Sequence, residues 1–175
     1  YYIHRDFEKA YSISGTPFLG KNCGMDSDNI IVYGHNMRNG TMFHDLLAYR
    51  DEDYYMKHRT IRFDSVTEPR EYEVIGAFYA KAYQTGDNVF QYYDYGGDLD
   101  EEQFMSYARQ IQKNTLYDSG IIPEYGDQLL TLSTCSYHVT DGRFVVVARL
   151  KTTNPAETME NGENPETLKT VGTDT

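Results

Sequence analysis

The stretch Leu129-Leu130-Thr131-Leu132-Ser133-Thr134-Cys135 is the most informative part of this 175-residue chain, and Arg143-Phe144-Val145-Val146-Val147 follows it closely. Both stretches are short and mostly apolar, which is typical of buried β-strands. A cysteine ends the first strand and an arginine begins the second. Cysteine supplies a nucleophile, and arginine supplies a fixed positive charge that can meet developing negative charge. With a histidine beside them, the two residues would form a cysteine acyl-transfer site.

Cys135 lies where a reactive cysteine is expected, although a free cysteine in a strand is usually buried and inert. Leu130 and Leu132 share one face of the predicted strand, whereas Thr131, Ser133 and Cys135 share the other. The cysteine therefore lies on the more polar face. It also lies at the end of its strand, where active sites are often built. Both features favour a functional role over a structural one.

The turn between the two strands decides how close Cys135 and Arg143 come. Asp141-Gly142 favours a two-residue hairpin. That hairpin would pair Thr140 with Arg143 and place Cys135 about 16 Å along the ladder from the arginine. The alternative ends the first strand at Cys135 and makes residues 136–142 a loop, so that Cys135 and Arg143 face each other. Local turn rules favour the hairpin, and the chemistry requires the loop.

His35 is the best candidate for the catalytic base. It follows the short buried strand Ile30-Ile31-Val32-Tyr33 and a glycine, a place where a strand end delivers a side chain to a site. His138 is nearer to Cys135 in sequence, but three residues along a strand place it on the opposite face. That parity argument weakens if the segment is a loop. The other three histidines lie in polar surroundings typical of solvated side chains.

The composition excludes several classes of protein. The net charge of −11 argues against binding nucleic acid, whose phosphates require a basic surface. Two cysteines, Cys23 and Cys135, do not make a disulfide framework, and no C-x-x-C spacing indicates a metal site. We expect no metal and no cofactor. A Cys23–Cys135 disulfide is formally possible but would consume the nucleophile, and we interpret Cys23 as a non-catalytic thiol.

Strand-like segments outnumber helices, so the chain is predicted to be mainly β, as a barrel or sheet with helical insertions. The clearest helix runs from Glu101 to about Leu116, directly before the cysteine strand. Asp100 is its expected N-cap and Gln103 completes a capping box. The other segments predicted to be strands are residues 30–33, 60–63 and 72–82.

The last part of the chain differs in character. Residues 152–175 contain no aromatic residue and five acidic residues against one basic residue. Such a segment cannot bury enough apolar area to offset its ordering entropy. We therefore predict one catalytic domain over residues 1–151 and an acidic, flexible tail over residues 152–175.

Taken together, the motifs resemble those of class B sortases, the cysteine transpeptidases of Gram-positive cell surfaces. Thr131–Cys135 is similar to their TLxTC signature, and the strand that starts at Arg143 looks like their last strand with its essential arginine. The stretch Tyr33-Gly34-His35-Asn36-Met37, continuing to Phe43, looks like their histidine motif. The helix before the cysteine strand is similar to the class B insertion, and residues 2–7 also look like class B. The resemblance covers roughly residues 1–150.

The resemblance implies a sortase β-barrel of eight strands, with an N-terminal helical segment and the long helix inserted before the cysteine strand. It also implies an enzyme on the extracellular face of the cell membrane, held by a single N-terminal anchor that this sequence does not include. Its partners would be surface proteins that carry a sorting motif and a peptidoglycan precursor that supplies the accepting amine.

The resemblance further implies the reaction. Cys135 would attack the carbonyl of a threonine in a C-terminal sorting motif, forming a thioester that a cell-wall peptide amine then resolves. His35 would move protons, Arg143 would hold the substrate carbonyls, and Ser133 and Thr134 would line the substrate groove. Three alternatives remain open: a cysteine peptidase that only hydrolyses, a sortase that polymerises pilins, and an inactive binding domain.

Overall fold

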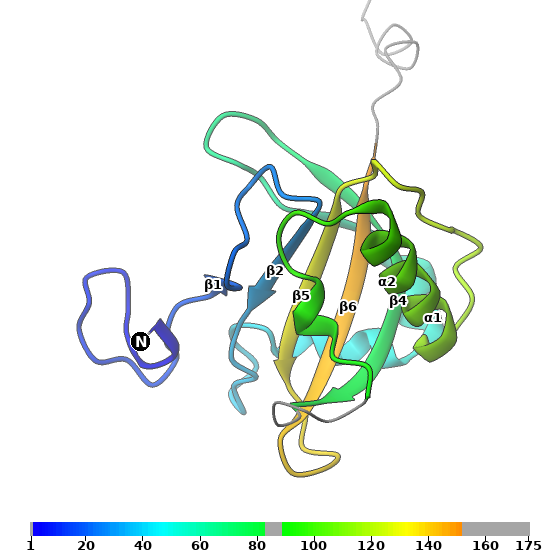
Figure 1. Ribbon diagram of the computed structural model, residues 1–175. Helices are drawn as coiled ribbons and strands as arrows, with labels where there is room; N and C mark the ends of the chain where they lie inside the picture. Colours follow the sequence, from blue (N-terminus) through cyan, green and yellow to red (C-terminus); the bar gives the residue numbers. More distant parts are fainter. Residues whose placement is uncertain (1, 83–88, 152–175) are drawn as a thin grey trace, which may run out of the picture.

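A six-stranded sheet organises the part of the chain that the structure describes (Figure 1). The computed structural model describes residues 2–82 and 89–151 of the chain. The strand order is β1-β2-β5-β6-β4-β3, with β2 and β5 parallel and the other neighbours antiparallel. The strands are β1 (Phe18–Leu19), β2 (Asn29–Tyr33), β3 (Thr60–Arg62), β4 (Glu71–Lys81), β5 (Leu129–Cys135) and β6 (Gly142–Leu150). The two stretches singled out by the sequence, β5 and β6, therefore lie at the centre of the sheet.

Helix α2 (Glu101–Asn114) is the long helix that the sequence predicts before β5. Its capping box is confirmed, because the Asp100 side chain accepts from the main chain of Gln103 while the Gln103 side chain binds back to the main chain of Asp100. The helix ends two residues before the predicted Leu116, because the N–H of Leu116 donates to the carbonyl of Ala77 in β4. The other helices are α1 (Glu52–Lys57) and the 3₁₀ helices η1 (Tyr2–His4), η2 (His44–Arg50) and η3 (Tyr92–Tyr95).

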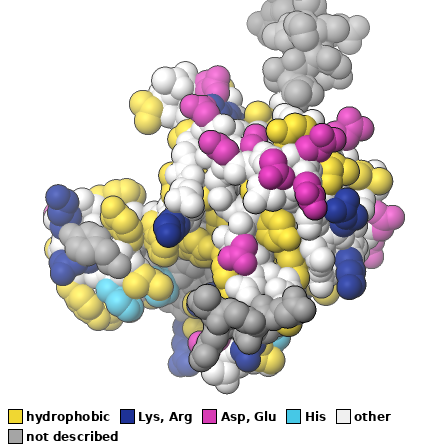
Figure 2. Space-filling model, viewed as in Figure 1, with side chains coloured by type: hydrophobic (Ala, Val, Ile, Leu, Met, Phe, Trp, Pro, Cys, Tyr) yellow, Lys and Arg dark blue, Asp and Glu magenta, His cyan; other side chains and the backbone are white. Residues whose placement is uncertain are grey.

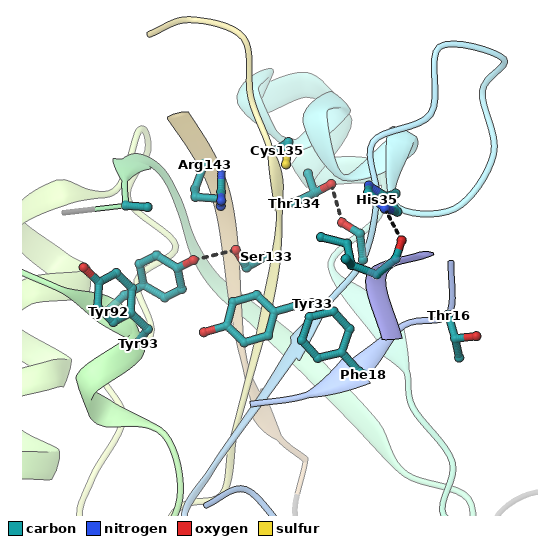
Figure 3. Close-up of a pocket in the computed structure, with 13 residues that line it drawn as sticks. Thr16, Phe18, Tyr33, His35, Tyr92, Tyr93, Ser133, Thr134, Cys135 and Arg143 are labelled. Carbon is teal, nitrogen blue, oxygen red and sulfur yellow. Dashed lines mark hydrogen bonds between the residues drawn. The ribbon is translucent and has the colours of Figure 1, made fainter. Parts of the chain in front are cut away.

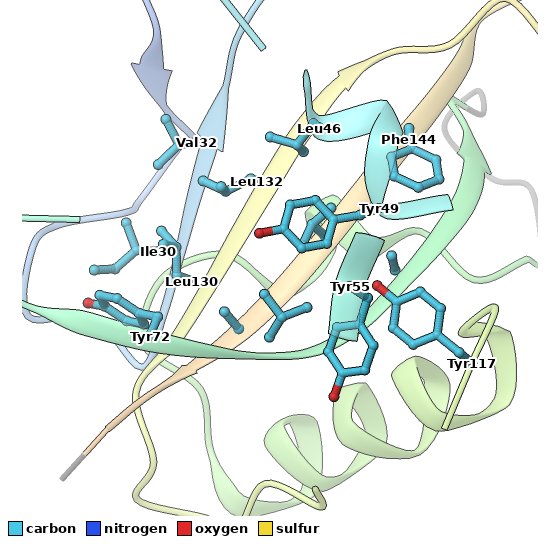
Figure 4. Packing of buried hydrophobic residues seen from close by; sticks show 14 residues of the cluster. Ile30, Val32, Leu46, Tyr49, Tyr55, Tyr72, Tyr117, Leu130, Leu132 and Phe144 are labelled. Atoms are coloured by element: carbon cyan, nitrogen blue, oxygen red, sulfur yellow. The ribbon is translucent and has the colours of Figure 1, made fainter. Parts of the chain in front are cut away.

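Hydrophobic cores cover both faces of the sheet. One face packs against η2 and α1, and Figure 4 shows Leu130, Leu132 and Tyr49 among the residues that gather on this side. The other face packs against α2, where Phe104 and Tyr107 meet Leu129. The predicted division of β5 into two faces is therefore confirmed. The more polar face is nevertheless buried, because α2 and η3 cover it.

Buried hydroxyls on that face are satisfied by tyrosines of the covering elements. Thr131 is fully buried, and its hydroxyl is 2.9 Å from that of Tyr107. Ser133 is 1% exposed, and its hydroxyl is 2.7 Å from that of Tyr92. A polar group buried without a hydrogen bond is costly, so these pairings make a polar strand face compatible with the core. Some of the many tyrosines in the sequence therefore provide hydrogen-bond partners for buried hydroxyls.

The expected count of eight strands is not confirmed, since the described residues form six. Three further pairings among the described residues, Arg5 with Tyr11, Asn29 with Gly97 and Asn36 with Met42, are isolated bridges too short to count as strands. The expected N-terminal helical segment is likewise reduced to the single turn η1, after which the chain forms a loop. That loop leaves Phe7 and Tyr11 exposed rather than packed against the core. Figure 2 shows hydrophobic side chains at the surface of this N-terminal part of the molecule.

No helix within residues 2–82 and 89–151 is both long enough and apolar enough to cross a membrane. The predicted flexible tail, residues 152–175, lies outside the described residues, and its boundary stays a prediction.

Candidate active site

The parallel pairing of β2 and β5 brings His35 and Cys135 to the same edge of the sheet. The last pair in this ladder is Tyr33 with Ser133, so the register offset between the strands is 100 residues. His35 and Cys135 are separated by the same offset, each two residues beyond that pair. The register of two neighbouring strands therefore brings the histidine to the end of the sheet where the cysteine lies.

The pairing of β5 and β6 places Arg143 directly opposite Cys135. Side chains of directly opposed residues lie on the same face of a sheet. The N–H of Ser136 donates to the carbonyl of Gly142 over 2.9 Å, and the N–H of Gly142 donates to the carbonyl of Val139 over 3.0 Å. The connection is therefore a loop that starts after Cys135, and the tight hairpin favoured by local turn rules is wrong.

The three predicted residues line one cavity of about 190 Å³. Because β5 lies between β2 and β6, Cys135 lies between Arg143 and His35, as Figure 3 shows. Four aromatic side chains from β1, β2 and η3 complete the walls: Phe18, Tyr33, Tyr92 and Tyr93. His138 is absent from this lining, and its Nδ1 is instead 3.0 Å from the hydroxyl of Ser136. His35 therefore lines the cavity and His138 does not, and the catalytic role of His35 stays a prediction.

His35 is held by contacts that the sequence does not predict. Its Nε2 is 2.6 Å from the main-chain carbonyl of Ile3, a residue of η1. Because a carbonyl oxygen can only accept a hydrogen bond, Nε2 carries the hydrogen and Nδ1 of the neutral ring keeps its lone pair. The ring of His4 lies 5.8 Å from that of His35. No sequence signal points to Ile3, because any residue can offer a carbonyl.

Arg143 directs its charge toward the cavity. Its Nη1 donates to the carbonyl of Gly142 over 3.0 Å, and it takes part in none of the ion pairs among the described residues. Burial raises the pKa values of Tyr33 and Tyr92, and the positive charge of Arg143 partly offsets that rise in both. The guanidinium is therefore close to two cavity walls and has no carboxylate partner in the described structure.

Ser133 and Thr134, the predicted groove residues, form the floor of the cavity rather than an exposed surface. Thr134 is 2% exposed, and its hydroxyl donates to the carbonyl of Gly34 over 2.8 Å. The hydroxyl of Ser133 is paired with Tyr92, as described above. Both side chains line the cavity, but their hydroxyls have partners within the protein. Their role as substrate-binding residues stays a prediction.

Cys23 lies apart from this cavity. Both cysteines are free, so the formally possible disulfide does not form. The sulfur of Cys23 accepts from the N–H of Ile31 over 3.4 Å, which gives it a place in the packing beside β2. Within the described residues, no group of three or more histidine, cysteine or acidic side chains is placed to hold a metal ion.

Comparison with known proteins gives a consistent result. Residues 10–151 match the family model described as the sortase domain. Sortase B of Listeria monocytogenes is 30% identical over 156 residues, which cover 87% of this chain and 61% of that protein. The chain thus spans about three fifths of the length of this curated relative.

Two solved structures show the same fold. A crystal structure of Clostridium perfringens sortase B has a TM-score of 0.75 and 27% identity, covering 86% of this chain and 81% of that one. A Staphylococcus aureus sortase B–substrate complex has a TM-score of 0.73 and 26% identity, covering 87% of this chain and 69% of that one. The mainly β fold with a curled sheet is therefore that of class B sortases.

Proposed function

The chain belongs to the sortase family, and from that premise we propose that it is a cysteine transpeptidase acting on surface proteins. The observation that supports this most directly is the pairing of Cys135 with Arg143 across two strand ends, with His35 lining the same cavity. Each of these side chains supplies one function that acyl transfer requires: a nucleophile, a proton carrier and a fixed positive charge.

The first half of the proposed reaction forms a thioester. Cys135 gives its proton to His35, and its sulfur attacks the carbonyl carbon of a threonine in the sorting motif. The carbon–nitrogen bond after that threonine then breaks, and His35 returns the proton to the departing amine. Since Nε2 of His35 already donates to Ile3, Nδ1 is the atom that accepts and returns the proton.

The second half transfers the acyl group. An incoming amine attacks the thioester carbonyl and its proton passes to His35. The bond between sulfur and carbon then breaks, and His35 gives the proton to the sulfur, which restores the Cys135 thiol. Arg143 stays protonated throughout, so its proposed role is to hold the substrate carbonyl and offset the negative charge of each tetrahedral intermediate. Four aromatic side chains line the cavity. By limiting the access of water to the thioester, they would favour attack by an amine over hydrolysis.

We also propose where the enzyme works and what it joins. The donors would be surface proteins with a C-terminal sorting motif, and the acceptor would be an amine of a peptidoglycan precursor. Both lie outside the cell membrane, so we place the enzyme on the extracellular face, held by an N-terminal anchor. The similarity to class B sortases supports the transpeptidase function, and the location, the anchor and the acceptor are part of the proposal.

A peptide-transfer assay tests the proposal. We expect a library of sorting-motif pentapeptides to contain at least one that is cleaved after threonine and, with triglycine present, converted to a ligated product. Cys135→Ala, His35→Ala and Arg143→Ala should each reduce turnover at least a hundredfold. Full activity in Cys135→Ala would reject a cysteine mechanism. Hydrolysed peptide alone at every triglycine concentration would indicate a peptidase instead.

A further inference from the structure

The main-chain ladder between β2 and β5 stops just before the proposed site. Its last rung runs from the N–H of Gly34 to the carbonyl of Ser133, over 3.1 Å. Beyond this rung two side chains continue the connection. The hydroxyl of Thr134 donates to the carbonyl of Gly34 over 2.8 Å, and the side-chain amide of Asn36 donates to the carbonyl of Cys135 over 3.0 Å.

The geometry of a parallel ladder shows what the second of these bonds replaces. Carbonyls two residues apart on one strand point to the same neighbour and accept from N–H groups two residues apart on it. Since Ser133 accepts from Gly34, an uninterrupted ladder would have Cys135 accept from the main-chain N–H of Asn36. The chain instead turns away, and Asn36 pairs with Met42. The side chain of Asn36 supplies the bond that its main chain would have made.

The amide of Asn36 is fixed at both ends. The carbonyl of Cys135 can only accept, so the amide nitrogen faces it and the amide oxygen faces the other way. That oxygen is 3.0 Å from Nδ1 of His44, which must therefore donate. An amide with a donor and an acceptor both engaged cannot rotate without losing a hydrogen bond.

We propose that Asn36 is a positioning residue that holds the main chain of Cys135 in register with His35, an inference that rests on the proposed transpeptidase function. It allows the histidine to leave the sheet and enter the cavity while the cysteine strand stays fixed. It acts through the Cys135 carbonyl and not on the substrate. Displacement of a reacting group by about 1 Å can slow a reaction by about a hundredfold. Loss of this bond therefore lowers the rate of the chemical step and leaves substrate affinity largely unchanged.

The test compares two asparagines of the same loop in the pentapeptide assay. Asn36→Asp keeps the shape but replaces the donor with a carboxylate oxygen that faces a carbonyl. We expect kcat to fall at least tenfold with KM within twofold of the unmodified protein. Asn39→Asp is the matched control, because it makes the same charge change at an exposed position where Asn39 contacts Thr41. Asn39→Asp should leave kcat and KM within twofold of their values in the unmodified protein.

Circular dichroism shows whether each variant is folded. If Asn36→Asp is not folded, Asn36→Ala is measured instead, and the same changes in kcat and KM are expected. The inference is overturned if kcat stays within twofold in a folded Asn36 variant while Cys135→Ala is inactive. A raised KM with unchanged kcat also overturns it, because that result indicates substrate binding. If Cys135→Ala is fully active, the proposed function fails first and the positioning role fails with it.

Discussion

At the scale of a single residue, the lack of a side chain at Gly34 affects the position of His35, the proposed base. A Cβ atom added to it would lie 2.6 Å from the ring of Phe43, closer than real atoms approach. Phe43 in turn donates its N–H to the carbonyl of His35 over 2.8 Å. The absence of a side chain at one position therefore allows an aromatic ring to pack against the main chain that carries the histidine.

Gly34→Ala is expected to reduce activity more than stability. Either the ring of Phe43 or the main chain must move, at a cost of about 1–3 kcal/mol in the free energy of unfolding. Because Phe43 is bonded to His35, the shift also displaces the imidazole, and we expect kcat/KM to fall at least tenfold. Urea unfolding and the peptide assay measure the two effects.

Gly24→Ala is the matched control for this substitution. A Cβ atom there would meet only the hydroxyl of Ser27, at an ordinary 3.8 Å. We expect its stability to lie within about 0.5 kcal/mol of the unmodified protein and its activity to be unchanged. Equal activity of Gly34→Ala and Gly24→Ala would show that the packing of Phe43 does not position the histidine.

At the scale of elements, the sequence predicts what local rules and strand parity determine. The capping box of α2 depends on residues three apart, Asp100 and Gln103, and it forms as expected. The two faces of β5 follow from alternation alone and are also as expected. The register that brings His35 and Cys135 to the same end of the sheet is set by the pairing of two distant strands. Local rules do not predict this pairing, so the expectation that the two residues meet relied on the motif resemblance.

The turn after β5 shows how a distant contact overrides a local preference. Gly142 pairs with Lys81 of β4, and the carbonyl of Asp141 accepts from the N–H of Ala82. These contacts fix Asp141-Gly142 as the entry to β6, so the two residues cannot form the centre of a hairpin. Asp141 still adopts the left-handed conformation typical of turns, with φ at 58°. The contact between Ile3 and His35 escaped prediction for a similar reason, since it joins distant segments through a main-chain atom.

Helix α2 offers a prediction at this scale, because it covers the buried polar face of β5. Asp100→Ala removes the N-cap and should lower the free energy of unfolding by about 1 kcal/mol. Asp98→Ala, an exposed position just before the helix, makes the same charge change and should cost less than about 0.5 kcal/mol. Thermal unfolding measures both. Equal midpoints for the two variants would show that the capping box does not stabilise α2.

At the scale of the whole molecule, buried tyrosines make the fold sensitive to alkaline pH. Burial raises the pKa of Tyr49 to about 12, and it also raises the pKa values of Tyr72, Tyr107 and Tyr117. A raised pKa in the folded state means that unfolding releases protons once the pH exceeds the unfolded value of about 10. The stabilisation from these neutral phenols is complete below about pH 10 and is lost as the pH rises above it.

Tyr117→Phe isolates one of these phenols without removing a hydrogen bond. The hydroxyls of Tyr117 and Tyr55 are buried and have no hydrogen-bond partner in the described structure, and their rings stack at 4.4 Å. Deleting a buried unsatisfied hydroxyl removes a desolvation cost of about 1–3 kcal/mol, so Tyr117→Phe should be more stable at neutral pH. Above pH 10 its advantage should grow by up to about 1.4 kcal/mol per pH unit, because one phenol fewer must stay neutral.

Tyr107→Phe provides the contrast, because the hydroxyl of Tyr107 is paired with that of Thr131. Its loss leaves the Thr131 hydroxyl with fewer partners, so this variant should be less stable than the unmodified protein at neutral pH. Urea unfolding at pH 7 and pH 10.5, together with the absorbance of tyrosinate, measures both variants. Because Tyr107 also has a raised pKa, its deficit should shrink as the pH rises. A pH-independent difference for both variants would show that buried phenols do not govern the alkaline limit of this fold.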